Sequence, residues 1–277
     1  SAFIVLLARP PSGRAPPPFA RTPPQARAPV PMFQGSILEQ AFARRGCVPS
    51  RGGRAECGRA RGAWRTGERL NYRGEHYTFT LMTPFFTPPA HEYDIPIYIA
   101  GVNTRLCRLA GEVADGFHVH PLNSAAYLSE IVRPAISEGA EQAGRRLDDI
   151  ALSASVFAVT GRDAAEIAAS KEAVRQQISF YASTPSYRVI LETHGWAETG
   201  ERLSRLAARK QWGEMPALID DEMLETFAIV APPEEVGRRA LARYRGLVDR
   251  VTLYVPFVPG QFDALWEPAI AAFAEQA

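Results

Sequence analysis

Residues 95–121, IPIYIAGVNTRLCRLAGEVADGFHVHP, decide the fold class of this chain. The run at 95–100 is apolar and rich in β-forming residues, and Gly101 follows it at once. Apolar residues then recur at helical spacing until an Asp-Gly pair ends the helix, and residues 117–120 have the character of a second short strand. A strand, a helix and a strand with short turns indicate a βαβ unit with parallel strands.

The start of the predicted helix is a candidate anion site. Asn103 can cap this helix, whose first turn leaves backbone N–H groups without intrahelical acceptors and carries the positive end of the helix dipole. A phosphate is the usual ligand of such a site. The alternative is that Gly101 only allows the chain to turn, and the unit by itself favours neither interpretation.

From Trp64 onward, strand-like and helical segments alternate, which is typical of an α/β fold with a parallel sheet or barrel inside and helices outside. Further strands are predicted at 151–160 and 251–256, and another at 3–8. Residues 71–80 predict a hairpin or an extended arm around Gly74. Helices are predicted at 127–144 (with a kink at Pro134), 163–181, 187–194, 201–209, 217–227, 232–247 and 262–276. A closed barrel of eight strands needs more strands than these.

The segment 9–63 differs from the rest in composition. It holds ten arginines, no lysine and two acids, a balance of +8, whereas the remainder of the chain carries −7. Its prolines exclude regular structure over most of its length, although 37–45 could form two helical turns. A basic arm, a proline-rich linker and a stretch read in a shifted frame of a GC-rich gene all fit this composition. Because this segment has no lysine and only three aromatic residues (Phe19, Phe33 and Phe42), we favour the third interpretation over a nucleic-acid-binding arm. The predicted domains are therefore 1–63 and 64–277.

Composition narrows the class of protein further. The chain has 277 residues, is 46% hydrophobic and carries a formal net charge of +1, so it can bury a substantial core. No run approaches the ~18 apolar residues of a transmembrane helix, and the apolar start at 3–8 lacks the features of a secretory signal. Three cysteines without CxxC spacing favour reduced thiols, and we expect a cytoplasmic location. The chain begins with Ser1 rather than Met, as a processed product or a fragment does.

His118 and His120 are the candidate catalytic residues. They alternate along a strand and therefore point to one face. A metal site would need a third ligand, and no HExxH motif or acidic cluster supplies one, so we expect no metal. At the carboxyl end of a strand they can line a ligand pocket, where a neutral imidazole donates a hydrogen bond or relays a proton. A satisfied histidine pair without a catalytic role is the alternative.

The other polar residues give weaker signals. Ser183, Thr184 and Tyr187 could reach a pocket or could simply end a helix. The sequence has no GxSxG, no P-loop and no GxGxxG motif, which removes the local support for hydrolase, NTPase and dinucleotide-binding readings.

Several motifs taken together resemble a known family. These are Tyr72-x-Gly74-x-x-Tyr77 with a proline-rich loop after it, then IPIYIAG, LAGEVADGF and VDRVTLYVPF. From about Trp64 to the end, the chain resembles the luciferase-like monooxygenase superfamily, and within it the deazaflavin (coenzyme F-420) dependent oxidoreductases.

This resemblance implies a (β/α)8 barrel of the TIM type, incomplete on its N-terminal side, with coenzyme F-420 or FMN at the carboxyl ends of the strands. It implies hydride transfer between coenzyme F-420 and a small organic substrate. The alternatives are an FMN-dependent monooxygenase and an inactive barrel fragment. The cofactor's phosphate would be held at Ala100, Gly101, Val102 and Asn103, with Gly116 in the next conserved turn of the family. The resemblance also implies a homodimer, and we expect no nucleic-acid or membrane partner.

Overall fold

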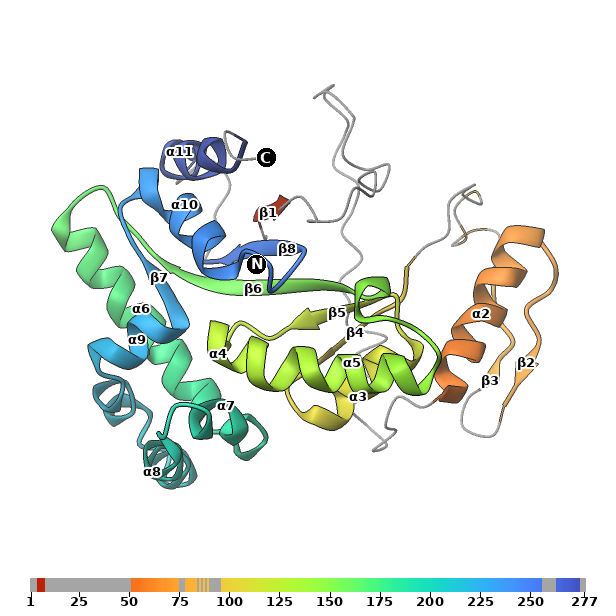
Figure 1. Cartoon of the computed structure of the whole chain (residues 1–277), viewed down its shortest axis with the longest axis horizontal. Helices are drawn as coiled ribbons and strands as arrows, with labels where there is room; N and C mark the ends of the chain where they lie inside the picture. Colours follow the sequence, from red (N-terminus) through yellow and green to blue (C-terminus); the bar gives the residue numbers. More distant parts are fainter. Residues whose placement is uncertain are drawn as a thin grey trace. The chain divides into compact units, whose positions relative to one another are not determined.

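The computed structural model describes residues 4–7, 51–74, 78–83, 85, 87, 89, 96–255 and 263–274. The chain divides into two compact units (Figure 1). The larger unit comprises Ser1–Pro10 and Pro96–Ala277, and the smaller unit comprises Pro11–Ile95. The domain boundary expected at Trp64 falls within a helix of the smaller unit.

A six-stranded sheet organises the larger unit. The parallel strands β4, β5, β6 and β8 lie side by side, and the short β7 also pairs in parallel with the end of β6 (Figure 1). Strand β1 pairs with β8 in the antiparallel direction. The bounds are β1 (Ile4–Leu7), β4 (Tyr98–Gly101), β5 (Gly116–Val119), β6 (Ala151–Val159), β7 (Ala228–Val230) and β8 (Arg250–Tyr254). Five of the six strands were predicted from the sequence, and only β7, which has three residues, was missed.

The two faces of this sheet differ in chemistry because side chains alternate along each strand. One face is apolar and fully buried, with Phe117, Val119, Leu152, Ala154, Val156, Val251 and Leu253. The other face carries His118, Ser153, Ser155, Arg250, Thr252 and Tyr254. We call the second face the polar face. The apolar face forms the core, and the polar face carries the candidate residue His118.

Helices α3 (Thr104–Val113) and α5 (Arg133–Gln142) pack closely against each other. Their contact is made by backbone, because a Cβ atom at Gly139 would overlap the carbonyl oxygen of Arg108. A Cβ atom at Gly111 would likewise overlap the carbonyl oxygen of Ile136. This close approach fixes the position of α3, whose first turn lies at the carboxyl end of β4.

The helix predicted at 127–144 is present with an irregular start. It comprises α4 (Ala125–Tyr127), a π-helical turn η2 (Leu128–Val132) and α5. Pro134 lies in the first turn of α5, directly after the π-helical turn. Because proline has no N–H to donate, the wider turn lies where the regular hydrogen-bond ladder is interrupted. The π-helical turn thus directly precedes Pro134, and the kink at this proline stays a prediction.

The remaining helices follow the predicted order with shifted ends. The helix predicted at 187–194 is split into a 3-10 turn and α7, and the one predicted at 217–227 is split into a 3-10 turn and α9. The bounds are η3 (Leu147–Asp149), α6 (Ala164–Ala182), η4 (Pro185–Tyr187), α7 (Arg188–Glu192), α8 (Ala197–Ala208), η5 (Trp212–Glu214), η6 (Pro216–Leu218), α9 (Asp221–Phe227), α10 (Pro233–Tyr244) and α11 (Asp263–Ala274).

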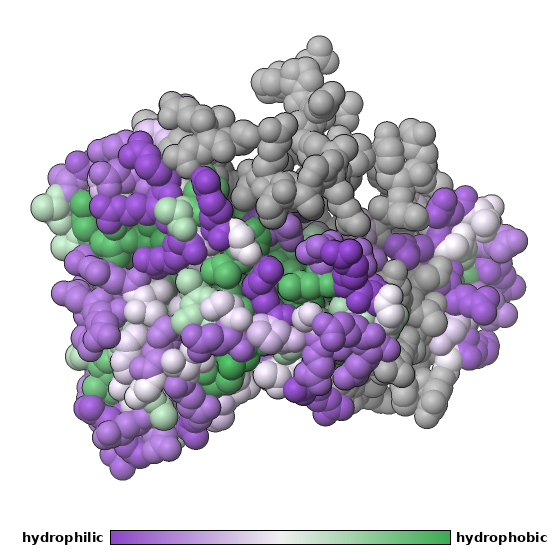
Figure 2. All heavy atoms as spheres, viewed as in Figure 1, coloured by the Kyte–Doolittle hydropathy of each residue, from purple (hydrophilic) through white to green (hydrophobic). Residues whose placement is uncertain are grey.

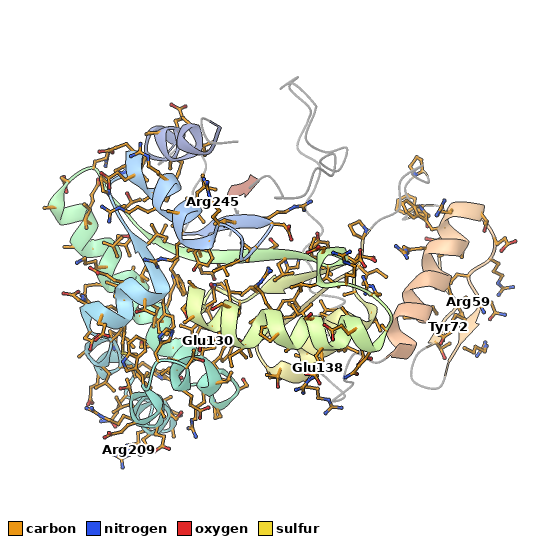
Figure 3. The ribbon with its side chains drawn as sticks, in the orientation of Figure 1. Arg59, Tyr72, Glu130, Glu138, Arg209 and Arg245 are labelled. Carbon is orange, nitrogen blue, oxygen red and sulfur yellow. The ribbon has the colours of Figure 1, made fainter. Side chains whose placement is uncertain are left out.

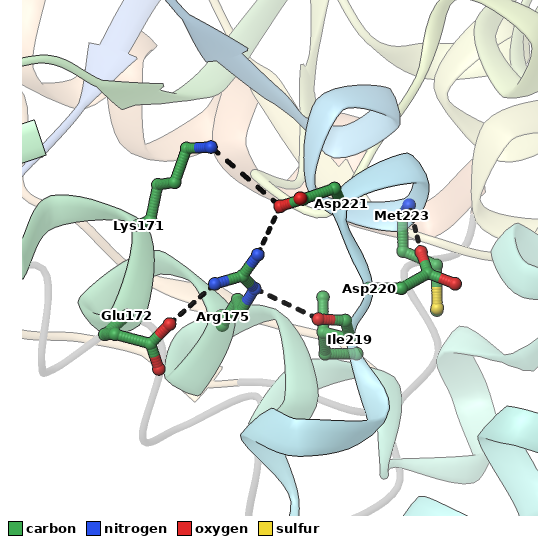
Figure 4. A network of polar contacts seen from close by, with 7 residues as sticks. All are labelled: Lys171, Glu172, Arg175, Ile219, Asp220, Asp221 and Met223. Atoms are coloured by element: carbon green, nitrogen blue, oxygen red, sulfur yellow. Dashed lines mark hydrogen bonds and ion pairs between the residues drawn. The ribbon is translucent and has the colours of Figure 1, made fainter. Parts of the chain in front are cut away.

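A polar network joins α6 to the start of α9 (Figure 4). Arg175 of α6 donates from Nε to the carbonyl oxygen of Ile219 over 3.0 Å and forms ion pairs with Glu172 and Asp221. Lys171 lies 3.9 Å from the same Asp221 carboxylate. The acids are largely exposed, so the ion pairs contribute little, and the half-buried bond to Ile219 mainly sets the register of the two helices.

The smaller unit contains α2 (Arg51–Thr66) and a hairpin of β2 (Tyr72–Arg73) and β3 (Thr78–Phe79). The hairpin confirms the prediction for 71–80. The prediction of irregular structure before Trp64 is wrong for residues 51–63, which are helical. Alanine and arginine are strong helix formers, and residues 51–66 contain no proline to interrupt them. The rest of 9–63, including the two turns predicted at 37–45, lies outside the described residues.

The architecture is an α/β fold with a mainly parallel sheet and helices, as predicted. Within the described residues the sheet path runs from β1 to β4 and does not close into a barrel. No helix of the described residues is long and apolar enough to cross a membrane. On the face shown in Figure 2, hydrophilic side chains cover most of the described surface, and hydrophobic residues show in smaller areas between them.

Candidate active site

The turn between β4 and α3 has the geometry that the sequence predicted. Asn103 is the N-cap of α3, and its Oδ1 accepts a hydrogen bond from the backbone N–H of Leu106 over 2.9 Å. Helix geometry leaves the N–H groups of Thr104 and Arg105 without intrahelical acceptors. The hydroxyl of Tyr127 donates to the carbonyl oxygen of Val102 over 2.5 Å and holds the turn in place. These free N–H groups form a cradle suited to an anion.

Two of the predicted turn residues adjoin β5. Ala100 lies opposite His118, and Gly101 lies opposite Val119 in the parallel register. The missing side chain of Gly101 makes room for Leu106, because a Cβ there would come within 2.7 Å of the Leu106 Cβ. Gly101 thus permits the close packing of α3 on the end of β4, whereas its φ lies outside the left-handed region. The anion site at the start of α3 stays a prediction.

Gly116 lies at the other end of β5, opposite Tyr98. A Cβ atom at Gly116 would overlap the ring of Tyr98, so the glycine provides the space that this ring occupies. The neighbouring Asp115 accepts a hydrogen bond from the N–H of Ile97 over 2.8 Å and ties the start of β5 to β4. The structure therefore does not bring Gly116 together with the turn at 100–103, although the sequence grouped them.

His118 lies on the polar face, and its side chain is exposed. Its ring contacts that of Tyr98, with the centroids 4.8 Å apart. Partial burial lowers the pKa of His118, and the positive charge of Arg250 lowers it further. At neutral pH the imidazole is therefore mainly neutral and available to accept or donate a proton.

His120 follows the end of β5 in different surroundings. Its ring lies against those of Tyr181 and Tyr187, with both centroids 4.6 Å away. Burial lowers the pKa of His120 to about 4. The Nδ1 atom accepts a hydrogen bond from the N–H of Leu122 over 3.1 Å, which places the proton of the neutral ring on Nε2. His120 is thus a neutral hydrogen-bond donor at pH 7.

Aromatic side chains from four elements, β6, α6, η4 and β8, form a cluster beside His120. Tyr181 and Tyr254 share a hydrogen bond between their hydroxyls over 3.3 Å, and Phe157 contacts both rings. Burial, together with the neighbouring Tyr254, raises the pKa of Tyr181, so the hydroxyl stays protonated. We call His120, Phe157, Tyr181, Tyr187 and Tyr254 the aromatic cluster. The aromatic cluster forms a weakly polar surface at the carboxyl ends of β5, β6 and β8.

The loop after β5 is held by buried polar contacts. Asn123 donates to the carbonyl oxygens of His120 (2.7 Å) and Ser155 (2.8 Å), and it accepts from the hydroxyl of Tyr244. Ser124 lies 2.8 Å from Nε2 of His194. The side-chain nitrogen and oxygen of Asn123 both have partners within the protein. Asn123 therefore holds the backbone of His120, and with it the imidazole, in place and does not bind a ligand.

Sequence analysis identified only part of this site. It named Tyr187, but it missed Tyr181 and Tyr254, which come from α6 and β8 and carry no local motif. Ser183 caps the end of α6 and donates to the carbonyl oxygen of Phe180, which agrees with its helix-ending interpretation. Among the described residues, no group of three potential metal ligands exists.

The fold and this site define a class of protein in which a parallel α/β sheet binds its ligand at the carboxyl ends of the strands. The family model for luciferase-like monooxygenases matches residues 59–250, and the chain belongs to this family. It is 44% identical over 190 residues to an uncharacterized protein of Mycobacterium tuberculosis, an alignment that covers 68% of this chain and 56% of that relative. It is 30% identical over 174 residues to the 5,10-methylenetetrahydromethanopterin reductase of Methanopyrus kandleri, over 62% of this chain and 48% of the reductase.

Solved structures agree with this placement. The coenzyme F-420-dependent tetrahydromethanopterin reductase from M. kandleri matches with a TM-score of 0.60 and 25% identity, over 76% of this chain and 60% of that chain. A coenzyme F-420-dependent secondary alcohol dehydrogenase matches with a TM-score of 0.51 and 17% identity, which shows the shared fold alone. The chain spans about half the length of the curated relatives it matches.

Proposed function

We propose that this chain carries the carboxyl-terminal part of an active site that transfers a hydride between coenzyme F-420 and a small organic substrate. The observation that carries the proposal is the juxtaposition of the capped start of α3 with the aromatic cluster, at the carboxyl ends of strands in one sheet. The similarity to a reductase of methylenetetrahydromethanopterin supports the cofactor class.

The residues present fit a phosphate-bearing, planar cofactor. The first turn of α3 offers free N–H groups after Ala100, Gly101, Val102 and Asn103, and these would hold a phosphate. The aromatic cluster offers flat apolar surfaces for a ring system. Because Gly116 makes room for the Tyr98 ring, we assign it an indirect role in shaping the strand beside the site.

A bound deazaflavin or flavin supplies the hydride chemistry, and the chain positions the reactants and handles the proton. His120, held neutral and oriented by the N–H of Leu122, would donate a hydrogen bond from Nε2 to an oxygen of the substrate. His118, which is exposed and mainly neutral at pH 7, would exchange a proton with solvent. We expect no direct role for a metal.

The competing proposal is an FMN-dependent monooxygenase, which the family membership favours equally. We would titrate the purified chain separately with coenzyme F-420 and with FMN and follow the fluorescence of each cofactor. Micromolar binding of coenzyme F-420 alone supports hydride transfer, and tight binding of FMN alone supports the monooxygenase. If neither binds to folded protein, the chain is an inactive part of a barrel and the proposal is wrong. A homodimer and a cytoplasmic location stay predictions that this titration does not test.

A further inference from the structure

A row of polar residues crosses the sheet beside the candidate site. His118 on β5 lies opposite Ser153 on β6, and Ser153 in turn lies opposite Arg250 on β8. The strands β5, β6 and β8 lie side by side (Figure 1). Because the three residues stand in register on these strands, their side chains lie on the same face of the sheet, the polar face. We call these three residues the polar row. The register, not the sequence spacing, brings them together.

Arg250 is the unusual member of the polar row. It is only partly exposed, yet it forms no ion pair or side-chain hydrogen bond with any residue that the structure describes. Its neighbour Asp249 does not neutralise it, because the Asp249 carboxylate accepts the N–H of Leu152 on the next strand. Burying part of a guanidinium group without a hydrogen-bond partner costs free energy. A bound anion would supply that partner, so an arginine in this position is suited to bind an external anion.

The rest of the row has matching chemistry. Ser153 places a hydroxyl between the two basic side chains, and this hydroxyl makes no hydrogen bond with another described residue. Two residues further along β6 and β8, Ser155 and Thr252 lie opposite each other on the same face. An array of N–H and O–H donors around a positive charge is complementary to an oxyanion with several acceptor oxygens.

We propose that the polar row binds the oxyanion group of a small ligand, a carboxylate or a phosphate, through Arg250 and Ser153 with His118 at its edge. The assignment of that ligand as the substrate rests on the function proposed above, whereas the binding itself does not. If both hold, the substrate is a small organic anion whose charged end lies on β8 and whose reacting end reaches toward His120.

The test measures anion binding to the full chain by calorimetry, with inorganic phosphate and with succinate as probes. Arg250→Gln keeps the packing of the aliphatic part of the side chain and removes its charge. Arg250→Lys keeps a positive charge but lacks the planar guanidinium group. The matched control is Arg209→Gln. Arg209 directly follows α8 (Figure 3) and lines a separate groove of about 310 Å³ with Arg202 and Arg205.

We expect at least one probe to bind, Arg250→Gln to weaken it about tenfold or more, Arg250→Lys to weaken it less, and Arg209→Gln to leave it unchanged. The probe that binds better identifies the group as a phosphate or a carboxylate. The proposal is overturned if the folded chain binds neither probe, or if Arg250→Gln leaves the binding unchanged, as it would if the anion bound only at the start of α3 or in the groove that Arg209 lines.

Thermal melting separates this role from a structural one. An arginine without a protein partner can be replaced by Gln without loss of stability, so the melting temperature of Arg250→Gln should equal or exceed that of the parent chain. A clear decrease in the absence of anion would show that Arg250 supports the fold and would refute the proposal. Since cofactor titration is a separate measurement, failure of hydride transfer and failure of anion binding are distinguishable.

Discussion

Replacing Gly139 by alanine tests how the α3–α5 contact supports the phosphate cradle. The added methyl would overlap the carbonyl oxygen of Arg108 and would stand 2.8 Å from its Cα. To increase the distance between the added methyl and the Arg108 Cα to an ordinary contact of 3.4 Å, the two helices must separate by more than half an ångström. Because backbone atoms cannot change rotamer, the two helices must move as bodies.

The magnitude follows from two opposing effects. Overpacking a tight contact costs about 1–3 kcal/mol, and the backbone nature of this contact places it at the upper end. Alanine regains about 1 kcal/mol of helix propensity over glycine. We therefore expect a net loss of about 2 kcal/mol in the free energy of unfolding. For a unit of this size, the melting temperature should fall by about 4–8 °C.

The assay is urea unfolding followed by circular dichroism, paired with cofactor titration. Gly200→Ala is the matched control, since Gly200 lies in α8 of the same unit and its nearest neighbour would be the flexible end of Leu191 at 3.3 Å, with the Ala182 carbonyl oxygen at an ordinary contact of 3.9 Å. We expect this control to be neutral or stabilised by up to about 1 kcal/mol. If Gly139→Ala is as stable as the control, the backbone contact between α3 and α5 does not exist as described.

Three further changes test the site. Asn103→Ala removes the cap on the Leu106 N–H and should cost about 1 kcal/mol of stability, whereas Asn103→Ser should keep most of it; equal melting temperatures for the two variants would refute the cap. Burial lowers the pKa of His120 from 6.5 to about 4 in the folded chain. On acidification the unfolded chain therefore takes up this proton at a higher pH than the folded chain does. Stability should therefore fall as the pH decreases between these values, and His120→Gln should flatten this dependence in urea titrations at a series of pH values. Tyr181→Phe loses only the hydroxyl contact to Tyr254 and should reduce cofactor affinity less than Tyr181→Ala, which removes a wall of the aromatic cluster; the opposite order in fluorescence titrations would show that the ring is not part of the binding surface.

The sequence predicted the local elements well where short-range forces decide them. The apolar run before Gly101, the Asn103 cap and the strand at 117–120 are all present. Helix α6 begins after its predicted Asp163, whose carboxylate accepts the N–H of Glu166. Strand β7 was missed because three apolar residues directly after a helix carry no periodicity of their own.

What the sequence by itself determined is the α/β class and the order of most helices and strands, since periodicity and capping act within a few residues. Tertiary structure alone decided the surroundings of His118 and His120. The rings of Tyr181 and Tyr187 reach His120 from more than sixty positions later in the chain, and Arg250 joins His118 only through the register of three strands. Such long-range packing depends on how apolar faces are buried together, which no local pattern encodes.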